Sequence, residues 1–314
     1  MKLIVQVPCL NEAETLPLVL KSIPKKIAGI DEILVLIIDD GSSDDTVAVA
    51  RAHGVKHFVH HTRNQGLGRS FHDGVLKALE LGADILVNTD GDNQYPQERI
   101  ADLVQPIIRA EADIVIADRQ THTIEHFSKG KKLLQRLGSA IVNKAADTNL
   151  PDAVSGFRAY SRESLLQLNT ITRFSYCTET IIQAGNKRLA ITSIPVDTNP
   201  KLRESRLFKS TSEHVIKSAV TIMRAYIMYR PYVIFGSIGL ALMLAGAIPF
   251  ARFLYFAIVD GHTRGHIQSL LVGSLLMTSS FLSFILGIIA DLIRINRILI
   301  EDQLEQSKRL RFDR

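Results

Sequence analysis

The 314-residue sequence contains no tryptophan and two cysteines, and it has three charged residues between positions 231 and 290. Two cysteines, Cys9 and Cys177, are too few for a disulfide framework, which favours a reducing compartment. With 46% hydrophobic and 22% charged residues, the composition excludes a disordered chain. The first apolar run, MKLIVQVP, is short and ends in proline, so no signal peptide is expected.

The charge-poor segment holds two long apolar runs, Tyr232–Val259 and Ser269–Ala290. Because a helix needs about 20 apolar residues to cross a bilayer core, each run is long enough, and the short linker predicts a hairpin. A pair of buried core helices is the alternative, but the runs are too long and too poor in charge for it. Basic residues outside the hairpin outnumber the single Arg264 of the linker, which predicts an integral protein of the cell (inner) membrane with both termini cytoplasmic. These residues are Lys217, Arg224, Arg230, Arg294, Arg297, Lys308, Arg309 and Arg311.

The basic surplus of the chain is concentrated beside the apolar runs. Residues 1–198 carry 22 lysines and arginines against 24 acids, whereas residues 199–230 carry seven against two. Within that stretch, Phe208–Tyr229 has apolar residues spaced three and four apart with basic residues between them. The pattern predicts an amphipathic helix on a membrane surface, an ordinary domain helix being the alternative. This placement favours an anionic lipid partner and no nucleic acid.

Residues 1–198 alternate short apolar runs, typical of buried strands, with helix-like segments. The order predicts an α/β domain with a parallel sheet and helices on both faces. Ligands of such sheets bind at the carboxyl ends of the strands, so the polar residues there are the candidates for a site. The expected strands are Lys2–Pro8, Ile33–Asp39, Val55–His60, Ile85–Thr89 and Asp113–Ala117, and the expected helices are Ala13–Ser22, Asp44–Ala52, Leu67–Leu81 and Gln97–Glu111.

Polar sequences follow the first three expected strands. The first strand leads into PCLNE (residues 8–12) and the second into DDGSSDD (residues 39–45), a pattern that simple helix capping would also explain. The loop RNQGLGR after the third strand lacks the spacing of a dinucleotide-binding loop, which disfavours a nicotinamide-dependent oxidoreductase. Five nearby histidines, at positions 53, 57, 60, 61 and 72, lack metal-ligand spacing and are expected to be ordinary surface or strand-edge residues.

The fourth expected strand ends in a candidate metal site. Asp90 and Asp92, one residue apart, can face one cation, and Gln94 can supply a further oxygen. Mg²⁺ and Mn²⁺ take oxygen ligands, few of them protein carboxylates when the phosphates of a substrate complete the shell. A surface turn also favours such residues, but the preceding buried run ILVNT favours a site.

Five sequence motifs, taken in order, resemble those of the inverting glycosyltransferases of family 2, whose catalytic domain has the GT-A fold. They are PCLNE, DDGSSDDT, RNQGLGR, DGDNQ and DAVSGFR, and the resemblance covers residues 1–210. Within the family the chain is most similar to the polyprenyl-phosphate glycosyltransferases, which include the dolichyl-phosphate mannose synthases and bacterial relatives with a C-terminal pair of membrane helices. Tyr95 stands where these relatives often have histidine, and Arg-Glu-Ser-Arg at 203–206 replaces a Gly-x-Ser-Lys-like sequence.

The resemblance implies inverting transfer of one sugar from a UDP- or GDP-hexose to a membrane polyprenyl phosphate (undecaprenyl or dolichyl), with Mg²⁺ or Mn²⁺. It implies a cytosolic GT-A catalytic domain at 1–200, a basic loop and interfacial helix at 201–230, the membrane hairpin at 231–292 and a cytosolic basic tail at 293–314. A homo-oligomer, a tetramer as in relatives, is among the assemblies it implies.

The same resemblance assigns roles to individual residues. It implies a catalytic set (Asp152, Asp92, Arg119), a metal set (Asp90, Asp92, Gln94), a nucleotide-sugar set (Pro8, Leu10, Asn11, Glu12, Asp39, Asp40, Asp90, Gly91, Arg203, Arg206) and an acceptor-phosphate set (Arg119, Lys131, Arg136, Lys209). Asp152 matches the acid treated as the catalytic base, and Glu179 matches an acidic position of the family. Because a phosphate monoester with a second pKa of about 6 is mostly dianionic at neutral pH, we expect Asp152 to orient the acceptor rather than to act as a strong base.

Three alternatives differ in what they require. A membrane glycosyltransferase acting on a lipid or glycan hydroxyl would need Asp152 as a true base, and a catalytically silent scaffold would not need DGDNQ and DAVSGFR intact. A processive polysaccharide synthase uses a Gln-x-x-Arg-Trp motif, which the absence of tryptophan excludes.

Basic residues at 119–136 predict a specific acceptor site rather than general attraction to anionic headgroups, which is worth about 1 kcal/mol per basic residue. We expect the double replacement of Lys131 and Arg136 by alanine to abolish sugar transfer while liposome binding is largely kept. Sugar transfer to lipid and liposome cosedimentation measure the two effects, and equal loss of both would support general attraction.

Overall fold

The computed structural model describes residues 1–120, 129–170, 176–200, 220, 223, 227–259 and 267–312, without the side chains of 129–137. The chain forms two compact units, Met1–Ile222 with Glu301–Arg314 and Met223–Ile300. Of the predicted interfacial helix Phe208–Tyr229, residues 220, 223 and 227–229 are described and are helical. The predicted site residues Arg203, Arg206 and Lys209 lie outside the described residues.

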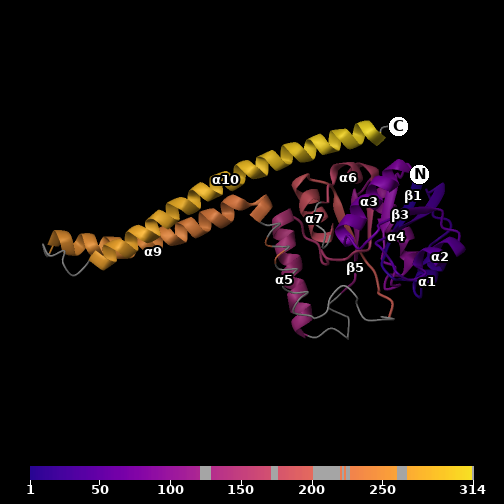
Figure 1. Ribbon diagram of the computed structural model, residues 1–314, viewed down its shortest axis with the longest axis horizontal. Helices are drawn as coiled ribbons and strands as arrows, with labels where there is room; N and C mark the ends of the chain where they lie inside the picture. Colours follow the sequence, from indigo (N-terminus) through magenta and orange to yellow (C-terminus); the bar gives the residue numbers. More distant parts are fainter. Residues whose placement is uncertain are drawn as a thin grey trace. The chain divides into compact units, whose positions relative to one another are not determined.

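The first unit is built on one mixed sheet of seven strands in the order β3-β2-β1-β4-β6-β5-β7. Helices and strands of this unit alternate along the chain (Figure 1). All five strands expected from the sequence are present and run parallel to one another. The sheet differs from the expected parallel one because β6 is inserted antiparallel between β4 and β5. The strands are β1 (Lys2–Cys9), β2 (Glu32–Asp39), β3 (His57–His60), β4 (Ile85–Asn88), β5 (Ile114–Asp118), β6 (Arg158–Ser161) and β7 (Ile191–Pro195).

Helices cover both faces of this sheet, as the sequence predicts. Alternate residues of β1, Val5 and Val7 among them, join a buried core with residues of α1 and α4. Gln6 faces the opposite side and meets α3, where a Cβ on Gly74 would lie 2.3 Å from its Oε1. The helices of this unit are α1 (Leu16–Ser22), α2 (Thr46–Ala52), α3 (Leu67–Glu80), the 3₁₀ turn η1 (Gln97–Arg99), α4 (Ile100–Ile108), α5 (Lys129–Ala146), α6 (Arg162–Gln167) and α7 (Tyr176–Asn186).

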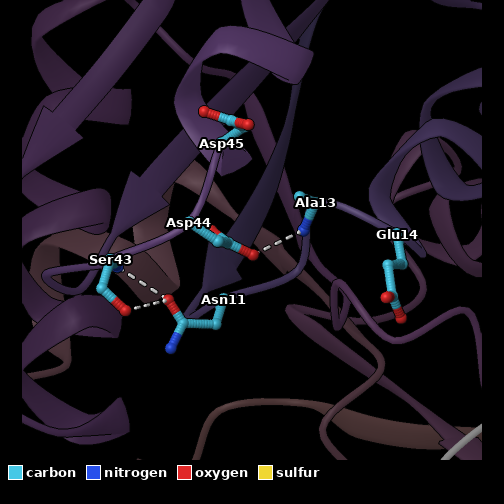
Figure 2. A pocket seen from close by; sticks show the side chains of 6 residues that line it. All are labelled: Asn11, Ala13, Glu14, Ser43, Asp44 and Asp45. Atoms are coloured by element: carbon cyan, nitrogen blue, oxygen red, sulfur yellow. Dashed lines mark hydrogen bonds between the residues drawn. The ribbon is translucent and has the colours of Figure 1, made fainter.

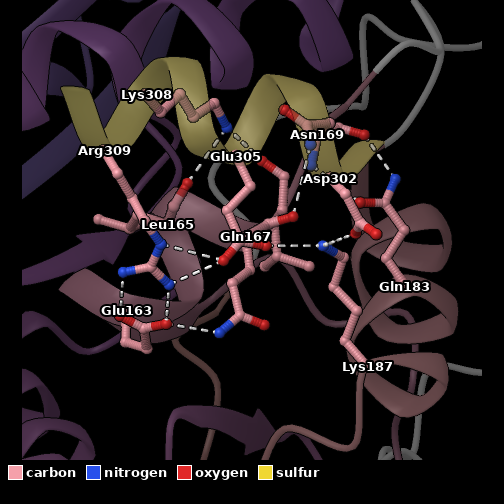
Figure 3. A network of polar contacts seen from close by, with 11 residues as sticks. Glu163, Leu165, Gln167, Asn169, Gln183, Lys187, Asp302, Glu305, Lys308 and Arg309 are labelled. Carbon is pink, nitrogen blue, oxygen red and sulfur yellow. Dashed lines mark hydrogen bonds and ion pairs between the residues drawn. The ribbon is translucent and has the colours of Figure 1, made fainter. Parts of the chain in front are cut away.

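The C-terminal end of α10 (Ile267–Phe312) packs on the first unit, and we call its residues 301–312 the C-terminal clasp. Lys308 is buried and donates from Nζ to the carbonyl oxygens of Leu165 and Leu168 at the end of α6, at 3.3 and 2.6 Å. Around it, Glu305 pairs with Lys187 of α7 at 3.0 Å, and Arg309 pairs with Glu163 of α6 (Figure 3). The clasp therefore joins α6 and α7 to the end of the chain.

The second unit is a helical hairpin of α9 (Pro231–Val259) and the preceding part of α10. Both helices are long and apolar enough to cross a membrane, with mean hydropathies of 2.1 and 2.0 over stretches of 18 residues. Ser280 and Ser283 donate to the carbonyl oxygens of Gly239 and Phe235 on the facing helix, at 2.7 and 2.8 Å. Glycine permits close approach, since a Cβ on Gly246 would lie 2.9 Å from Leu276 Cβ. Small residues and interhelical hydrogen bonds are the usual means of association between membrane helices.

Apolar side chains of this hairpin point outward. Ile248 is 73% exposed and Phe281 64% exposed, although both lie within the predicted spans. Such exposure suits lipid surroundings rather than water. Residues 293–312, expected as a tail after the hairpin, continue helix α10.

Burial of Lys308 makes stability of the first unit depend on pH. Burial, and then the positive charge of Lys187, lowers the pKa of Lys308 from 10.5 to about 8, while Glu305 acts in the opposite direction. Because the folded protein releases this proton more readily than the unfolded chain, stability rises as the pH increases from about 8 to about 10.5. We expect the rise, at most about 3 kcal/mol, to vanish in Lys308→Met, as measured by thermal unfolding.

Arg311→Met is the matched control, because Arg311 lies on the same clasp but makes an exposed ion pair with Glu80 at 3.0 Å. This variant should follow the wild-type pH profile, since exposed pairs contribute about 0–1 kcal/mol. Identical pH profiles for wild-type protein and Lys308→Met would contradict the assignment.

Candidate active site

The carboxyl ends of β1 and β2 are fastened to each other by the loops that follow them. Asn11, in the left-handed region with φ 57°, accepts a hydrogen bond on Oδ1 from the Ser43 amide at 2.7 Å. The backbone amide of Asn11 donates to Ser42 Oγ at 3.0 Å, and the backbone amide of Ala13 donates to Asp44 Oδ2 at 3.2 Å. These contacts surround an open pocket of about 480 Å³ (Figure 2). Its lining residues are Asn11, Ala13, Glu14, Ser43, Asp44 and Asp45.

The acids at the end of β2 are held by the backbone around them. Asp40 accepts from the amides of Gln65 and Gly66, at 2.8 and 2.9 Å, and contacts His61 Nδ1 at 2.7 Å. Asp39 accepts from the Ser42 amide at 3.0 Å. Asp40 therefore fixes the loop after β3, and its predicted role toward a nucleotide stays a prediction.

His61 directly follows the edge strand β3, in keeping with the expected surface or strand-edge histidine, but it is not on the surface. It is buried, and its Nε2 lies 3.1 Å from Asp73 of α3 while its Nδ1 contacts Asp40. Gly41 lets this loop approach β2, because it has a φ of 79° and a Cβ there would lie 2.7 Å from the Arg63 carbonyl carbon. The network supports the edge of the sheet on which the predicted nucleotide-binding residues lie.

Glu12 connects the end of β1 with the acidic turn after β4. Thr15 Oγ1 lies 2.9 Å from Glu12 Oε2 and 2.8 Å from the Gly91 carbonyl oxygen. The Glu12 amide donates to Thr46 Oγ1 at 2.8 Å. Pro8 and Leu10, predicted with Glu12 to hold the nucleotide, are half-buried beside it.

The turn after β4 brings three carboxylates together. Burial, the charge of Asp92 and that of Glu12 raise the pKa of Asp90 to about 7, although Arg119 acts in the opposite direction. Gln94 Nε2 donates to Asp92 Oδ2 at 2.7 Å, so its amide group lies against the carboxylate. Crowded carboxylates with little solvent are a donor set that fits a hard divalent cation.

Within the described part of the chain, no group of three or more His, Cys, Asp or Glu side chains has the arrangement of a metal site. Asp90 and Asp92 therefore fit a cation that takes its remaining ligands from elsewhere, as Mg²⁺ does with substrate phosphates.

A buried ion pair closes the other side of the site. Arg119 follows β5, and its Nε and Nη2 donate to the two oxygens of Asp152, at 2.7 and 3.0 Å. The Asp152 side chain is 1% exposed and that of Arg119 is 23% exposed. Burial alone would raise the pKa of Asp152, but the charge and hydrogen bonds of Arg119 outweigh it and hold that pKa below its usual range. Asp152 is thus a carboxylate at every physiological pH.

Gly156 brings the segment that follows Asp152 against the acidic turn. A Cβ on Gly156 would lie 3.4 Å from Asp90 Oδ2. The Gly156 amide donates to Tyr95 Oη at 3.2 Å, and its carbonyl oxygen accepts from Tyr176 Oη at 2.9 Å. Tyr95, which replaces the family's usual histidine, thus supports this segment, a role that the sequence alone did not reveal.

The structure therefore brings together most of the predicted site. One end of the sheet, at the carboxyl ends of its parallel strands, carries the ends of β1 and β2, the turn at 90–94, Arg119 and Asp152. The predicted acceptor residues Lys131 and Arg136 lie on α5, where side chains are not described, and their roles stay predictions. Glu179 is buried on α7.

A mixed α/β sheet with acids after β4 and an arginine–aspartate pair beyond β5 fits the glycosyltransferase class with a GT-A fold. The family follows from the sequence match: the family model described as glycosyl transferase family 2 matches residues 4–168, and the chain belongs to this family. The family and the fold that the motifs predicted are thereby confirmed.

Two curated relatives and one solved structure illustrate the similarity. The chain is 27% identical over 215 residues to the UDP-N-acetylglucosamine–dolichyl-phosphate N-acetylglucosaminyltransferase of Methanococcus voltae, over 61% of this chain and 83% of that protein. It is 30% identical over 171 residues to the undecaprenyl-phosphate mannosyltransferase of Micrococcus luteus, over 52% of this chain and 68% of that protein. Glucosyl-3-phosphoglycerate synthase of Mycobacterium tuberculosis, solved with Mn²⁺, UDP-glucose and phosphoglyceric acid, has a TM-score of 0.54 and 24% identity, covering 70% of this chain and 79% of that one.

The ion pair makes a prediction about pH. Because Arg119 keeps Asp152 ionised, Asp152→Asn should lower the rate of sugar transfer at both pH 5.5 and pH 8. Loss of charge-assisted hydrogen bonds worth about 1.5–3 kcal/mol corresponds to roughly 10- to 150-fold in rate. Initial rates at the two pH values check this.

Asp113→Asn is the control. Asp113 also accepts a hydrogen bond from a backbone amide, that of Ala190 at 2.9 Å, but it lies before the start of β5, at the opposite end of that strand from Arg119. Its rate should change only with the amount of folded protein. Near-normal transfer by Asp152→Asn at pH 8 with loss at pH 5.5 would instead fit a base.

Proposed function

We propose that the protein transfers one sugar from a nucleotide-sugar donor, a UDP- or GDP-hexose, to the phosphate of a membrane polyprenyl phosphate. The observation that carries the proposal is the bidentate pair of Asp152 with Arg119. A paired carboxylate with a lowered pKa is a poor general base, since an effective base has a pKa near the working pH. A hydroxyl acceptor would need such a base, whereas a phosphate is already an anion at neutral pH.

The names of the relatives agree with this acceptor. The proteins from Methanococcus voltae and Micrococcus luteus are named for transfer to dolichyl phosphate and undecaprenyl phosphate. Two helices long enough to cross a membrane suit an acceptor whose chain stays in the bilayer. We infer that both termini and the catalytic unit face the cytoplasm, because basic residues flank the hairpin on both outer sides.

The donor would lie along the ends of β1, β2 and β4. Asp90 and Asp92, with Gln94 beside them, would hold Mg²⁺ or Mn²⁺, which when bound supplies Lewis-acid stabilisation of the leaving diphosphate. The solved synthase from Mycobacterium tuberculosis was crystallised with Mn²⁺ and UDP-glucose, which supports use of a divalent ion.

The acceptor would react beside Arg119. An acceptor phosphate oxygen forms a bond to the anomeric carbon while the bond from that carbon to the nucleotide diphosphate breaks, with inversion. Asp152 holds the guanidinium in one orientation, and the Arg119 side chain remains 23% exposed. A preorganised cation of this kind stabilises the negative charge of the reacting phosphates without reorganisation.

Product analysis tests the proposal. Purified protein is incubated with Mn²⁺, polyprenyl phosphate and a panel of UDP- and GDP-sugars, and the lipid product is identified by mass. We expect one polyprenyl-phosphate sugar, and a product formed on a lipid or glycan hydroxyl instead would contradict the proposal.

Asp92→Asn should reduce product formation at least about tenfold, as loss of a metal-ligand charge implies. Asp102→Asn is the matched control, since Asp102, on α4, makes an exposed pair with Arg99 of η1. Equal activity of both variants would remove Asp92 from the proposed site.

A further inference from the structure

Arg158, the first residue of β6, is 0% exposed, and among the described residues it is the largest side chain that is fully buried. It makes four hydrogen bonds. Nε donates to the Ser155 carbonyl at 2.6 Å and Nη2 to the Ala153 carbonyl at 3.1 Å. Nη1 donates to the Cys177 carbonyl at 2.9 Å and to Thr180 Oγ1 at 3.0 Å.

The four acceptors belong to two segments. Ala153 and Ser155 lie in residues 152–157, which we call the Asp152 loop, and Cys177 and Thr180 lie in the first turns of α7. All four are uncharged oxygens, and among the described residues no carboxylate forms an ion pair with Arg158. A buried cation without a carboxylate is costly, and apolar residues fill a core at lower cost. Packing alone therefore does not explain an arginine here.

Side chains from other parts of the fold bind several backbone groups of the Asp152 loop. Arg158 binds the carbonyls of Ala153 and Ser155, and the next carbonyl, that of Gly156, accepts from Asn88 Nδ2 at 3.2 Å and Tyr176 Oη at 2.9 Å. The Tyr176 ring is stacked on Phe71 of α3, with centroids 4.0 Å apart. The Val154 amide turns back to Asp152 Oδ1 at 3.3 Å. The loop thus binds the buried arginine through two of its carbonyl oxygens and binds Arg119 through the Asp152 carboxylate.

We infer that Arg158 is a positioning residue for sugar transfer: it fixes the Asp152 loop, and through it the orientation of the Arg119–Asp152 pair beside Asp90. It acts through the loop and touches neither substrate. The inference rests on the proposed function, in which this pair faces the acceptor. Displacement of a reacting group by about 1 Å can cost about 100-fold in rate, which sets the scale of the effect.

The test compares Arg158→Lys with Arg162→Lys. Arg162 is a matched control because its guanidinium also donates to carbonyl oxygens, those of Ala83 and Phe312, but none lies in the Asp152 loop. A lysine keeps the charge but cannot reach both segments with one planar group. We expect Arg158→Lys to lower kcat about 10- to 100-fold, while the Kd of the nucleoside diphosphate with Mn²⁺ changes less than about threefold. Arg162→Lys should change neither.

Amide hydrogen exchange supplies a readout that does not depend on activity. The backbone amides of residues 152–157 should exchange at least about tenfold faster in Arg158→Lys. Exchange in the strands of the sheet other than β6 should be unchanged. Faster exchange throughout the sheet, or an unchanged kcat, would overturn the inference. Absence of a polyprenyl-phosphate product from the wild-type protein would instead overturn the proposed function, and the exchange data would still decide whether Arg158 fixes the loop.

A milder pair of variants serves if Arg158→Lys does not fold. Thr180→Val removes one acceptor of Arg158, whereas Thr180→Ser keeps the hydroxyl. We expect Thr180→Val to reduce kcat about 3- to 30-fold with the donor Kd unchanged. Thr180→Ser should keep the wild-type kcat. Equal kcat in both variants would overturn the inference.

Discussion

The buried pair of Arg119 and Asp152 is the interaction on which the site depends. It joins the end of β5 to the loop that precedes β6, two segments 33 positions apart in the sequence. Removing one partner would leave the other charge without compensation in a buried setting, which commonly costs about 3–5 kcal/mol. The pair is favourable only while its geometry is kept, so the surrounding structure must hold the loop. Tyr95, Tyr176 and Arg158 do this by binding its backbone.

Acidic residues lie on one side of the site, and the Arg119–Asp152 pair lies on the other. Negative charge is crowded at the ends of β1 and β4, where the charges of Asp92 and Glu12 raise the pKa of Asp90. Positive charge enters from β5 through Arg119. In the proposed function, a donor diphosphate with a divalent ion would bind on the first side and an acceptor anion on the second. The two reactants would then meet where the charge changes sign, an arrangement that needs no free base.

The sequence predicted the elements whose signal is local. Apolar runs identified the five parallel strands, and the polar residues after the fourth strand pointed to Asp90 and Asp92, whereas Arg119 was implied by the resemblance to the family. By contrast β6, with the sequence RAYS, is short and begins with a charged residue, so neither its pairing nor its antiparallel direction could be predicted. The burial of His61 and Arg158 was missed because Asp73 of α3 and Cys177 of α7, with which they interact, are distant in sequence and no spacing along the chain marks these contacts.

The clasp changes how the basic C-terminal residues are understood. Counted along the sequence, Lys308, Arg309 and Arg311 belong to the flank that favours a cytoplasmic C-terminus. In the folded protein, however, they bind the carbonyls of α6, Glu163 and Glu80. Because Glu163 and Glu80 offset part of their charge, Arg309 and Arg311 attract anionic headgroups less than unpaired residues would, although all three groups still oppose translocation during insertion. In the proposed orientation, attraction of the lipid phosphate therefore falls to the basic residues at 119–136 and 199–230, which also adjoin the site in sequence.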